Sequence, residues 1–289
     1  MDFCERRMKN KVSVGLVQMH CGDKVDINLD KATQGIREAA SKGAQIVCLP
    51  ELVNSPYFCQ QRDDRYFDLA EPVPGPTTAI LSEVAADCKV AVITSLFERA
   101  EKFYNTAVVV DAGGQLAGKY RKMHIPDDPA NHYDEAYYFA PGDLGFHAFR
   151  TAYATVGPMI CFDQWFPEGA RMEADEGAEI LFYPTAIGWP LSQTREELNR
   201  AENNMWKTVQ IAHGIANNCF VAAANRVGVE DRLNFWGSSF VSDPYGRVLI
   251  LAPANEEAIV VAECDLNVID EKKRDWPFLE ARRIKYEQS

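Results

Sequence analysis

The strongest constraint on the fold of this 289-residue chain is an internal repeat that relates its two halves. Four stretches of the first half recur in the second, each 131 to 142 residues later. They are VG at 14–15 with VG at 156–157, GAQIVCLP at 43–50 with GAEILFYP at 177–184, CKVA at 88–91 with CFVA at 219–222, and FYNTAVVVDAGG at 103–114 with FWGSSFVSDPYG at 235–246. The period is too long for a solenoid, whose repeats span about 20 to 50 residues. Unrelated α/β units also share Gly-Ala and Asp-Gly turns, but matches in several places favour two similar half-domains.

Short apolar segments alternate with helix-like ones in the first half. The apolar segments 12–19, 44–49, 90–97 and 105–111 are typical of strands. Asp26 can cap a helix that runs to about Lys42 and stops at Gly43, and Pro76 can open a helix that ends near Cys88. Strands and helices that alternate in this way predict an α/β fold.

The strands at 46–49 and 180–183 are apolar throughout, which is typical of strands buried on both faces. Two half-domains with helices on one face each can bury their bare sheets against one another. We therefore predict an α/β four-layer αββα sandwich built from two similar halves. No Gly/Ser-rich linker divides the halves, so residues 1–289 are expected to form a single domain.

The composition narrows the classes of partner. A net charge of −12 and a pI near 5.0 argue against a nucleic-acid-binding face and favour cationic solutes. No run of about 18 apolar residues is present, so no membrane span is expected, and residues 1–11 lack the apolar stretch of a signal peptide. The eight cysteines are scattered without a Cys-x-x-Cys pair, which predicts free thiols, no metal site and a cytoplasmic location.

Three reactive side chains follow predicted strands. Glu51 comes directly after the strand at 44–49, Cys161 ends the apolar run 155–160, and Lys122 lies in a polar stretch after a pair of strands. Ligands of open α/β sheets bind beyond the carboxyl ends of strands. Taken singly, Cys161 fits a buried structural thiol, Glu51 a helix-terminal charge and Lys122 a solvated face, so no one of them establishes a site.

The segments around these residues resemble the three signature segments of the nitrilase (carbon–nitrogen hydrolase) superfamily. They read LPE at 49–51, YRKMHIP at 120–126 and ICFDQWFPE at 160–168. The resemblance covers nearly the whole chain and includes YPTAIG at 183–188, NRVG at 225–228 and GSSF at 237–240. Within the superfamily the chain is most similar to the N-carbamoylputrescine amidohydrolase branch, through SPYFCQ at 55–60, DQWFP at 163–167, HIPDDP at 124–129, Glu135 and PGD at 141–143.

The resemblance implies a nitrilase-like αββα fold and a Glu-Lys-Cys catalytic triad. Cys161 is the expected nucleophile and Glu51 the expected general base, because a cysteine thiol is largely protonated near pH 7 and needs a base. Lys122 and the backbone N–H of Phe162 are expected to stabilise the oxyanion. Glu135 is expected to be a second, supporting carboxylate.

The activity implied by this branch is the hydrolysis of N-carbamoylputrescine to putrescine, carbon dioxide and ammonia, a step of polyamine biosynthesis, through a cysteine thioester. No cofactor or metal is required. The expected partner is a small, cationic carbamoyl-amine substrate. A homo-oligomer, a dimer or larger, is also expected, because residues 278–283 resemble a tail that crosses subunit interfaces in this superfamily.

The substrate-binding residues are less clearly indicated. Asp127 is a candidate contact for the cationic amine, and Tyr57 is a candidate to pack against the aliphatic stem, as are Trp165 and Trp189. The backbone around Thr185 is a candidate for binding the carbamoyl group, because the internal repeat aligns Thr185 with Glu51.

Three features depart from the family pattern. Pro158 precedes Cys161 within a strand, where it must lie at a position without a ladder hydrogen bond, such as a bulge or an edge. The stretches 131–134 and 189–195 also differ from expectation, and both could line the pocket.

Other functions remain open. The same chemistry could act on β-ureidopropionate, on an ω-amide such as 2-oxoglutaramate, or on a nitrile. The first two of these substrates carry a carboxylate and would need a basic residue at the far end of the pocket, and none stands out in the sequence. A binding or scaffold protein with a buried thiol is the alternative outside enzymology.

Overall fold

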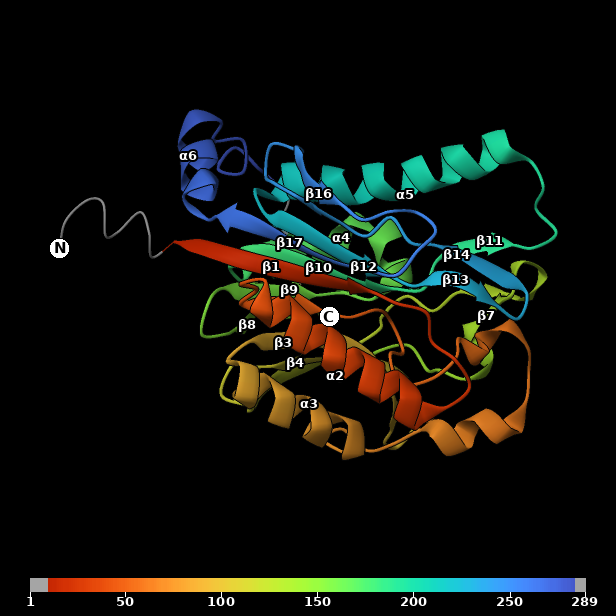
Figure 1. The fold of residues 1–289 in the computed structure, drawn as a ribbon. Coiled ribbons are helices and arrows are strands. Elements are labelled where there is room, and N and C mark those ends of the chain that lie inside the picture. Colours follow the sequence, from red (N-terminus) through yellow and green to blue (C-terminus); the bar gives the residue numbers. More distant parts are fainter. Residues whose placement is uncertain (1–9, 284–289) are drawn as a thin grey trace.

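Two six-stranded sheets lie face to face in the structure, a computed structural model that describes residues 10–283 (Figure 1). The first sheet has the order β17-β1-β2-β3-β4-β5 and the second the order β16-β15-β12-β10-β9-β8. The strands of the first sheet are β1 (Lys11–Gln18), β2 (Ile46–Cys48), β3 (Ala91–Arg99), β4 (Phe103–Val110), β5 (Leu116–Arg121) and β17 (Ala258–Asp265). Those of the second are β8 (Phe149–Arg150), β9 (Thr155–Pro158), β10 (Ile180–Thr185), β12 (Phe220–Asn225), β15 (Phe240–Ser242) and β16 (Val248–Leu251).

The internal repeat in the sequence corresponds to a repeated order of strands in the two sheets. The series β1-β2-β3-β4-β5 and β9-β10-β12-β15-β16 have the same neighbours, with two parallel pairs followed by two antiparallel pairs. Matched residues also pair alike, since Val14 lies opposite Ile46 and Val156 lies opposite Ile180. The prediction of two similar halves in an α/β sandwich is therefore confirmed.

Helices cover the outer face of each sheet. Helices α2 (Val25–Ser41) and α3 (Pro76–Cys88) pack on the first sheet, and α4 (Pro167–Asp175) and α5 (Glu196–Asn217) pack on the second (Figure 1). A last helix, α6 (Asn267–Asp275), follows β17. The expected cap of α2 is wrong, because Lys24 occupies the N-cap position and Asp26 lies in the first turn. There its carboxylate can still interact with the positive end of the helix.

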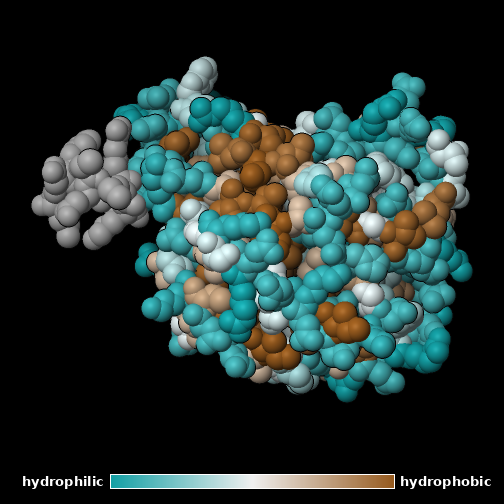
Figure 2. Space-filling view, viewed as in Figure 1, coloured by the Kyte–Doolittle hydropathy of each residue, from teal (hydrophilic) through white to brown (hydrophobic). Residues whose placement is uncertain are grey.

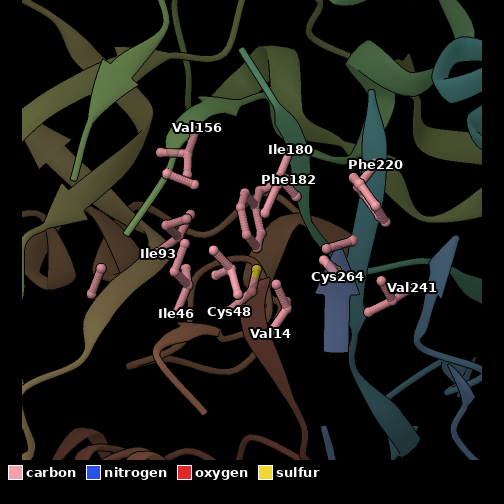
Figure 3. Packing of buried hydrophobic residues seen from close by; sticks show 14 of the residues in the cluster. Val14, Ile46, Cys48, Ile93, Val156, Ile180, Phe182, Phe220, Val241 and Cys264 are labelled. Atoms are coloured by element: carbon pink, nitrogen blue, oxygen red, sulfur yellow. The ribbon is translucent and has the colours of Figure 1, made fainter. Parts of the chain in front are cut away.

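The core between the sheets is apolar. Val14, Ile46 and Ile93 from the first sheet meet side chains of the second in one buried cluster, with Val156, Ile180, Phe182 and Phe220 among them (Figure 3). Each central strand also buries its other face under helices, which is why these strands read as continuous apolar runs rather than alternating ones.

Two glycines at matched positions let helices approach the sheets. A Cβ at Gly15 would lie 3.1 Å from the Cβ of Ala39 in α2, and a Cβ at Gly157 would lie 2.2 Å from the Oε2 atom of Glu173 in α4. The adjacent Pro158 ends β9 and breaks no ladder bond. The N–H of Met159 donates to the Phe182 carbonyl (2.9 Å), so position 158 faces the other side, where β8 pairs only with Thr155 and Val156.

Glu173 is a buried carboxyl group with no partner for either oxygen among the described residues. Burial, reinforced by the nearby Asp163 charge, raises the pKa of Glu173 well above its ordinary value. The folded protein therefore holds a proton that the unfolded chain loses above about pH 4.5, and this contribution to stability is lost as the pH rises.

We expect Glu173→Gln to be more stable than the parent protein at pH 8, by on the order of 1 to 3 kcal/mol, because the amide needs no proton. The advantage should shrink toward zero near pH 4, where the carboxyl is protonated in both states. Urea denaturation of both proteins from pH 4 to 9 measures the difference, and a pH-independent difference would contradict the prediction.

Short elements gather at the end of the sandwich where the parallel strands finish. A three-stranded sheet has the order β11 (Gly188–Pro190), β14 (Leu233–Trp236) and β13 (Val227–Glu230), and β6 (Asp127–Asp128) pairs with β7 (Tyr133–Asp134). The 3-10 helices are η1 (Phe58–Gln60), η2 (Asp64–Leu69), η3 (Pro129–Asn131), η4 (Glu135–Tyr137) and η5 (Cys161–Trp165). This end carries the candidate site.

The surface in Figure 2 is mainly hydrophilic, with an apolar area where Figure 1 places β16. Val248, Leu249 and Leu251 of this edge strand are each at least 40% exposed. Within residues 10–283, the structure contains no helix with the length and apolar character needed to cross a membrane.

Candidate active site

Four side chains from separate segments meet at this end of the sandwich. Glu51 follows β2, Lys122 follows β5, Glu135 opens η4 and Cys161 opens η5 after β9. The two halves join here, because the N–H of Glu51 donates to the carbonyl of Thr185 (3.4 Å), its counterpart in the repeat. The carboxyl ends of strands in both sheets thus converge on one site, as expected for an α/β fold.

Lys122 lies between two carboxylates and is fully buried. Its Nζ atom donates to Glu51 Oε1 (2.8 Å) and to both oxygens of Glu135 (2.9 and 2.7 Å). Burial by itself would lower the pKa of Lys122, but the Glu135 and Glu51 carboxylates outweigh it and raise that pKa well above its ordinary value. The ammonium group therefore stays charged across the physiological range.

Each carboxylate has a second polar contact. The Tyr57 hydroxyl donates to Glu135 Oε1 (2.7 Å), and the Asn105 side-chain amide donates to Glu51 Oε1 (2.7 Å). Burial raises the pKa of Glu135, and the Lys122 ammonium opposes that rise. The other oxygen of Glu51, Oε2, is buried and has no hydrogen-bond partner among the described residues, which leaves it free to accept a proton.

Cys161 lies on a tight turn at the floor of a pocket. Its φ angle of +39° is in the left-handed region, which is costly for a residue with a side chain and is common at functional sites. The residue is 5% exposed, and that surface faces the pocket. Burial and the Glu51 charge raise the pKa of the thiol, so it rests protonated and needs a base to become a nucleophile.

The Asp163 carboxylate holds this turn to the segment that carries Lys122. Its Oδ2 atom accepts hydrogen bonds from the N–H of Ile160 (3.0 Å) and from the Tyr120 hydroxyl (2.8 Å). Its Oδ1 atom accepts from the N–H of His124 (3.0 Å) and lies 2.8 Å from Nδ1 of the same residue. Asp163 thereby fixes the distance between the thiol and the ammonium group.

The buried guanidinium of Arg226 holds the backbone around Glu51. It donates to the carbonyls of Glu51 (3.1 and 2.9 Å), Leu52 (2.7 Å) and Ser55 (2.9 Å), and forms an ion pair with Glu230 at 2.7 Å. Leu52 has a φ of +50°, so the chain turns sharply just after the candidate base. Arg226 supplies the hydrogen bonds that this turn needs, because a buried carbonyl without a partner is costly.

A pocket of about 490 Å³ opens above Cys161. The two stretches that depart from the family pattern both contribute to its wall, through Asn131 and Tyr133 in one and Pro190, Ser192 and Gln193 in the other. Its described lining contains three carboxylates, those of Asp128, Glu135 and Glu202, and no lysine, arginine or histidine; Phe162, Trp165, Ile187 and Trp236 supply apolar surface. Such a pocket favours a small molecule with an apolar stem and a cationic end.

Only some of the candidate substrate-binding residues line the pocket. Phe162 lines the pocket, and its N–H lies in the first turn of η5, where helix N–H groups lack a partner within the helix. Asp127 is exposed, and its neighbour Asp128 lines the pocket instead. Tyr57 and Thr185 are buried outside the lining, with the Tyr57 hydroxyl on Glu135 and the Thr185 hydroxyl on the Tyr183 carbonyl.

Three residues that organise the site had no role in the sequence analysis, namely Asn105, Asp163 and Arg226. Asn105 is a polar residue within an apolar strand, and it lies in one of the repeated segments. These two features are the signal that could have identified it. Asp163 and Arg226 lie in segments that carry the family resemblance, but the partners that tie them to the segments of Lys122 and Glu51 are distant along the chain, such as His124 at 39 residues and Glu51 at 175. Only the folded structure could have identified these partners.

The arrangement has the parts needed for nucleophilic cleavage of an amide-like bond. A thiol lines the pocket, a carboxylate oxygen without a partner belongs to the same cluster, and a buried ammonium group supplies positive charge. The charges of Glu51, Lys122 and Glu135 all act on the pKa of the Cys161 thiol, so the four groups form one electrostatic unit.

Tyr57→Phe tests the coupling within this unit. Loss of the hydroxyl removes one of the hydrogen bonds that hold Glu135, and a hydrogen bond to a charged group contributes about 1.5 to 3 kcal/mol. We expect kcat/KM for the substrate to fall about 10- to 100-fold, with the fold retained. Tyr138→Phe is the matched control, because Tyr138 lies in the same aromatic cluster and its hydroxyl, among residues 10–283, bonds only backbone carbonyls and the N–H of Asp63. Equal losses in the two variants would contradict a specific role for Tyr57.

Comparisons with known proteins agree with this geometry. A family model described as carbon-nitrogen hydrolase matches residues 13–274. The chain is 42% identical to an N-carbamoylputrescine amidase from Oryza sativa subsp. japonica, over 95% of this chain and 92% of the relative. It is 37% identical to a citrullinase from Francisella tularensis subsp. tularensis, over 94% of this chain and 95% of the relative.

A solved structure is similar over the same extent. The crystal structure of a carbon-nitrogen hydrolase from Helicobacter pylori G27 aligns with a TM-score of 0.90 at 40% identity, covering 94% of this chain and 96% of that chain. The resemblance inferred from the three signature segments is thus confirmed, and so is the nitrilase-like fold. The chain belongs to the carbon–nitrogen hydrolase family and is an amidohydrolase.

Proposed function

We propose that this enzyme hydrolyses N-carbamoylputrescine to putrescine, carbon dioxide and ammonia, with Cys161 as the nucleophile. One observation carries the proposal. The pocket above Cys161 is lined by carboxylates and apolar side chains, and its described lining contains no basic side chain. N-carbamoylputrescine combines a ureido group with an apolar four-carbon stem and a terminal ammonium, which fits such a pocket.

The reaction proceeds in two halves. Glu51 accepts the thiol proton through its free oxygen as the sulfur attacks the ureido carbon, and the negative charge that develops on oxygen is stabilised by Lys122 and the N–H of Phe162. A C–N bond breaks, Glu51 returns the proton to the leaving nitrogen, and a thioester to Cys161 remains. A water molecule deprotonated by Glu51 then cleaves this thioester. One water is consumed overall. Hydrolysis of the thioester releases a carbamic acid, which loses carbon dioxide and frees the nitrogen that did not leave in the first half. That nitrogen is ammonia if putrescine left first, and putrescine if ammonia left first.

The roles of the two carboxylates follow from their contacts. Glu135 receives two hydrogen bonds from Lys122 and one from Tyr57, so its oxygens are committed to holding the ammonium in place. Glu51 shares only one oxygen with Lys122 and keeps the other free. This division favours Glu51 as the group that exchanges protons.

Other ureido or amide substrates fit less well. β-Ureidopropionate, an ω-amide such as 2-oxoglutaramate, and citrulline all carry a carboxylate, and none of the described lining residues offers that carboxylate a cation. Carboxylates placed against like charges are disfavoured. A nitrile has no such conflict, but the ammonium end of N-carbamoylputrescine uses the acidity of the pocket and a neutral nitrile does not.

The test is a substrate comparison. Purified enzyme is incubated with N-carbamoylputrescine, β-ureidopropionate, citrulline and 2-oxoglutaramate, while ammonia and the amine or acid products are quantified. We expect kcat/KM for N-carbamoylputrescine to exceed each of the others by about 100-fold or more, equivalent to about 2.7 kcal/mol. Ammonia release from a carboxylate substrate at an equal or higher rate would overturn the proposal.

The proposal extends to a homo-oligomer in the cytoplasm. Exposed apolar side chains on β16 and the exposed Phe278 favour association between copies of the chain. The seven described cysteines are free thiols, which suits a reducing compartment. Light scattering on the purified protein tests the assembly, and a monomer at micromolar concentration would contradict it.

A further inference from the structure

We propose that Glu202 of α5 binds the terminal ammonium group of the substrate and sets the preference of the enzyme for cationic ureas. The inference rests on the proposed function, since it concerns the far end of a substrate whose ureido group reacts at Cys161. Glu202 lines the same pocket as Cys161 and Glu135, although it comes from a helix on the outer layer of the sandwich.

The other two pocket carboxylates already have partners. Glu135 accepts hydrogen bonds from Lys122 and Tyr57. Asp128 accepts from the backbone N–H of Asn131 (3.3 Å) and from its side-chain amide (2.8 Å), which closes the turn of η3. Within residues 10–283, the carboxylate of Glu202 makes no hydrogen bond or ion pair, so it is the pocket carboxylate left for an external cation.

The helix presents Glu202 on a rigid support. Trp206, one turn further along α5, is fully buried and its indole N–H donates to Gln164 Oε1 (2.8 Å). The adjacent Asn203 donates to the Ser238 hydroxyl (3.3 Å). Binding groups held on anchored helices keep their geometry better than groups on loops. Glu202 is half-buried, so its attraction for a cation is less screened than at an open surface.

The apolar part of the pocket lining suits the rest of the substrate. Ile187, Met205 and Trp236 line the pocket together with Glu202 and offer apolar surface to a methylene chain. Gln164, which anchors Trp206, also lines the pocket and follows the nucleophile by three residues. The indole-to-amide bond therefore links the helix that carries Glu202 to the turn that carries Cys161, and it can set the length of substrate that spans both ends.

Glu202→Gln is the direct test, because it removes the charge and keeps the shape. We expect kcat/KM for N-carbamoylputrescine to fall at least tenfold, mainly through KM. N-butylurea has the same ureido group and stem but no ammonium, and its inhibition constant should change less than twofold. Glu197→Gln, an exposed residue outside the pocket on the same helix, is the matched control and should leave both values unchanged.

A charge reversal gives a second, independent measurement. Glu202→Lys should raise kcat/KM for 4-ureidobutyrate, which carries a carboxylate where N-carbamoylputrescine carries its ammonium, and should lower it for N-carbamoylputrescine. A parent enzyme that does not hydrolyse N-carbamoylputrescine overturns the proposed function. If the parent enzyme hydrolyses N-carbamoylputrescine and the Glu202→Gln variant keeps the same substrate preference, only the role of Glu202 is overturned.

Discussion

Replacing Cys161 with serine or alanine is expected to reduce hydrolysis of N-carbamoylputrescine by at least about 10⁴-fold, because removal of a nucleophile costs several orders of magnitude in kcat. Serine keeps the size of the side chain, but its hydroxyl is a far weaker nucleophile than a thiol that has lost its proton. The fold should survive, since Cys161 forms no disulfide and its closest polar contact is a long one to the Ala186 carbonyl (3.9 Å). Ammonia release and circular dichroism on the same preparations measure both effects.

A matched control separates loss of the nucleophile from loss of any thiol. Cys88 is half-buried at the end of α3 and is not among the residues that line the pocket, and Cys88→Ala should keep kcat within twofold of the parent. Incubation of the parent enzyme with substrate, followed by rapid acid quenching and mass spectrometry, should show an adduct on Cys161. Substantial turnover by a folded Cys161→Ala variant would remove the thioester mechanism.

The fold could be predicted in unusual detail because the sequence repeats itself. Matched segments such as 43–50 and 177–184 had to occupy equivalent places, and they do so as β2 and β10 with their flanks. Local details were less predictable. The strand expected at 44–49 is only Ile46–Cys48, since strand ends depend on the partners available. Helix α2 starts with Lys24 at its N-cap position and has no side-chain cap, so Asp26 does not mark its start.

Glu51, Lys122 and Cys161 could be proposed because each lies just after a strand, within a segment that resembles a known family. Glu135 was proposed from the family resemblance alone. The structure brings Glu51, Lys122, Glu135 and Cys161 into one electrostatic unit. The roles assigned to them remain predictions. The sequence could not show that one oxygen of Glu51 stays unpaired while the other is shared, because that depends on Asn105 of β4, a strand two places away from β2 in the sheet.

The substrate-binding residues were the least predictable from the sequence, because the direction of a side chain decides whether it reaches the pocket. Asp127 and Asp128 are neighbours in β6, where successive side chains point to opposite faces. To predict which of them lines the pocket, one must know which face of the strand the pocket lies on. Thr185 does lie opposite Glu51, as the repeat implies, but its hydroxyl donates its hydrogen bond to a backbone carbonyl. Glu202 carries no sequence signal, since it is one of several charged residues on α5.

Lys122→Met should cause the largest combined loss of activity and stability of any substitution at the site. Methionine has a similar length but leaves Glu51 and Glu135 buried without their shared ion-pair partner. Removing one partner of a buried ion pair costs about 3 to 5 kcal/mol of unfolding free energy. Activity should fall at least about 10³-fold, since the oxyanion loses its charged partner and the carboxylates lose their positions.

The stability loss should depend on pH with a definite sign. The pKa of Lys122 is raised in the folded protein, so its contribution is present below about pH 10.5 and is lost only at higher pH. In the variant, Glu135 loses the ammonium that opposes the effect of burial on its pKa, so this carboxylate takes up a proton that the unfolded chain binds only near pH 4.5. The deficit measured by urea denaturation should therefore be small near pH 4.5 and should grow as the pH rises toward 8.

Two further variants distinguish charge imbalance from a simple packing defect. Lys122→Met combined with Glu135→Gln removes one of the two buried carboxylates that have lost their partner. This double variant should regain part of the stability at pH 8 without regaining activity. Lys119→Met is the matched single control, because its partner Glu98 keeps its ion pair with Arg121 and should tolerate the loss. A pH-independent deficit in Lys122→Met, or no recovery in the double variant, would mean that the buried ammonium does not stabilise the protein through its ion pairs with these carboxylates.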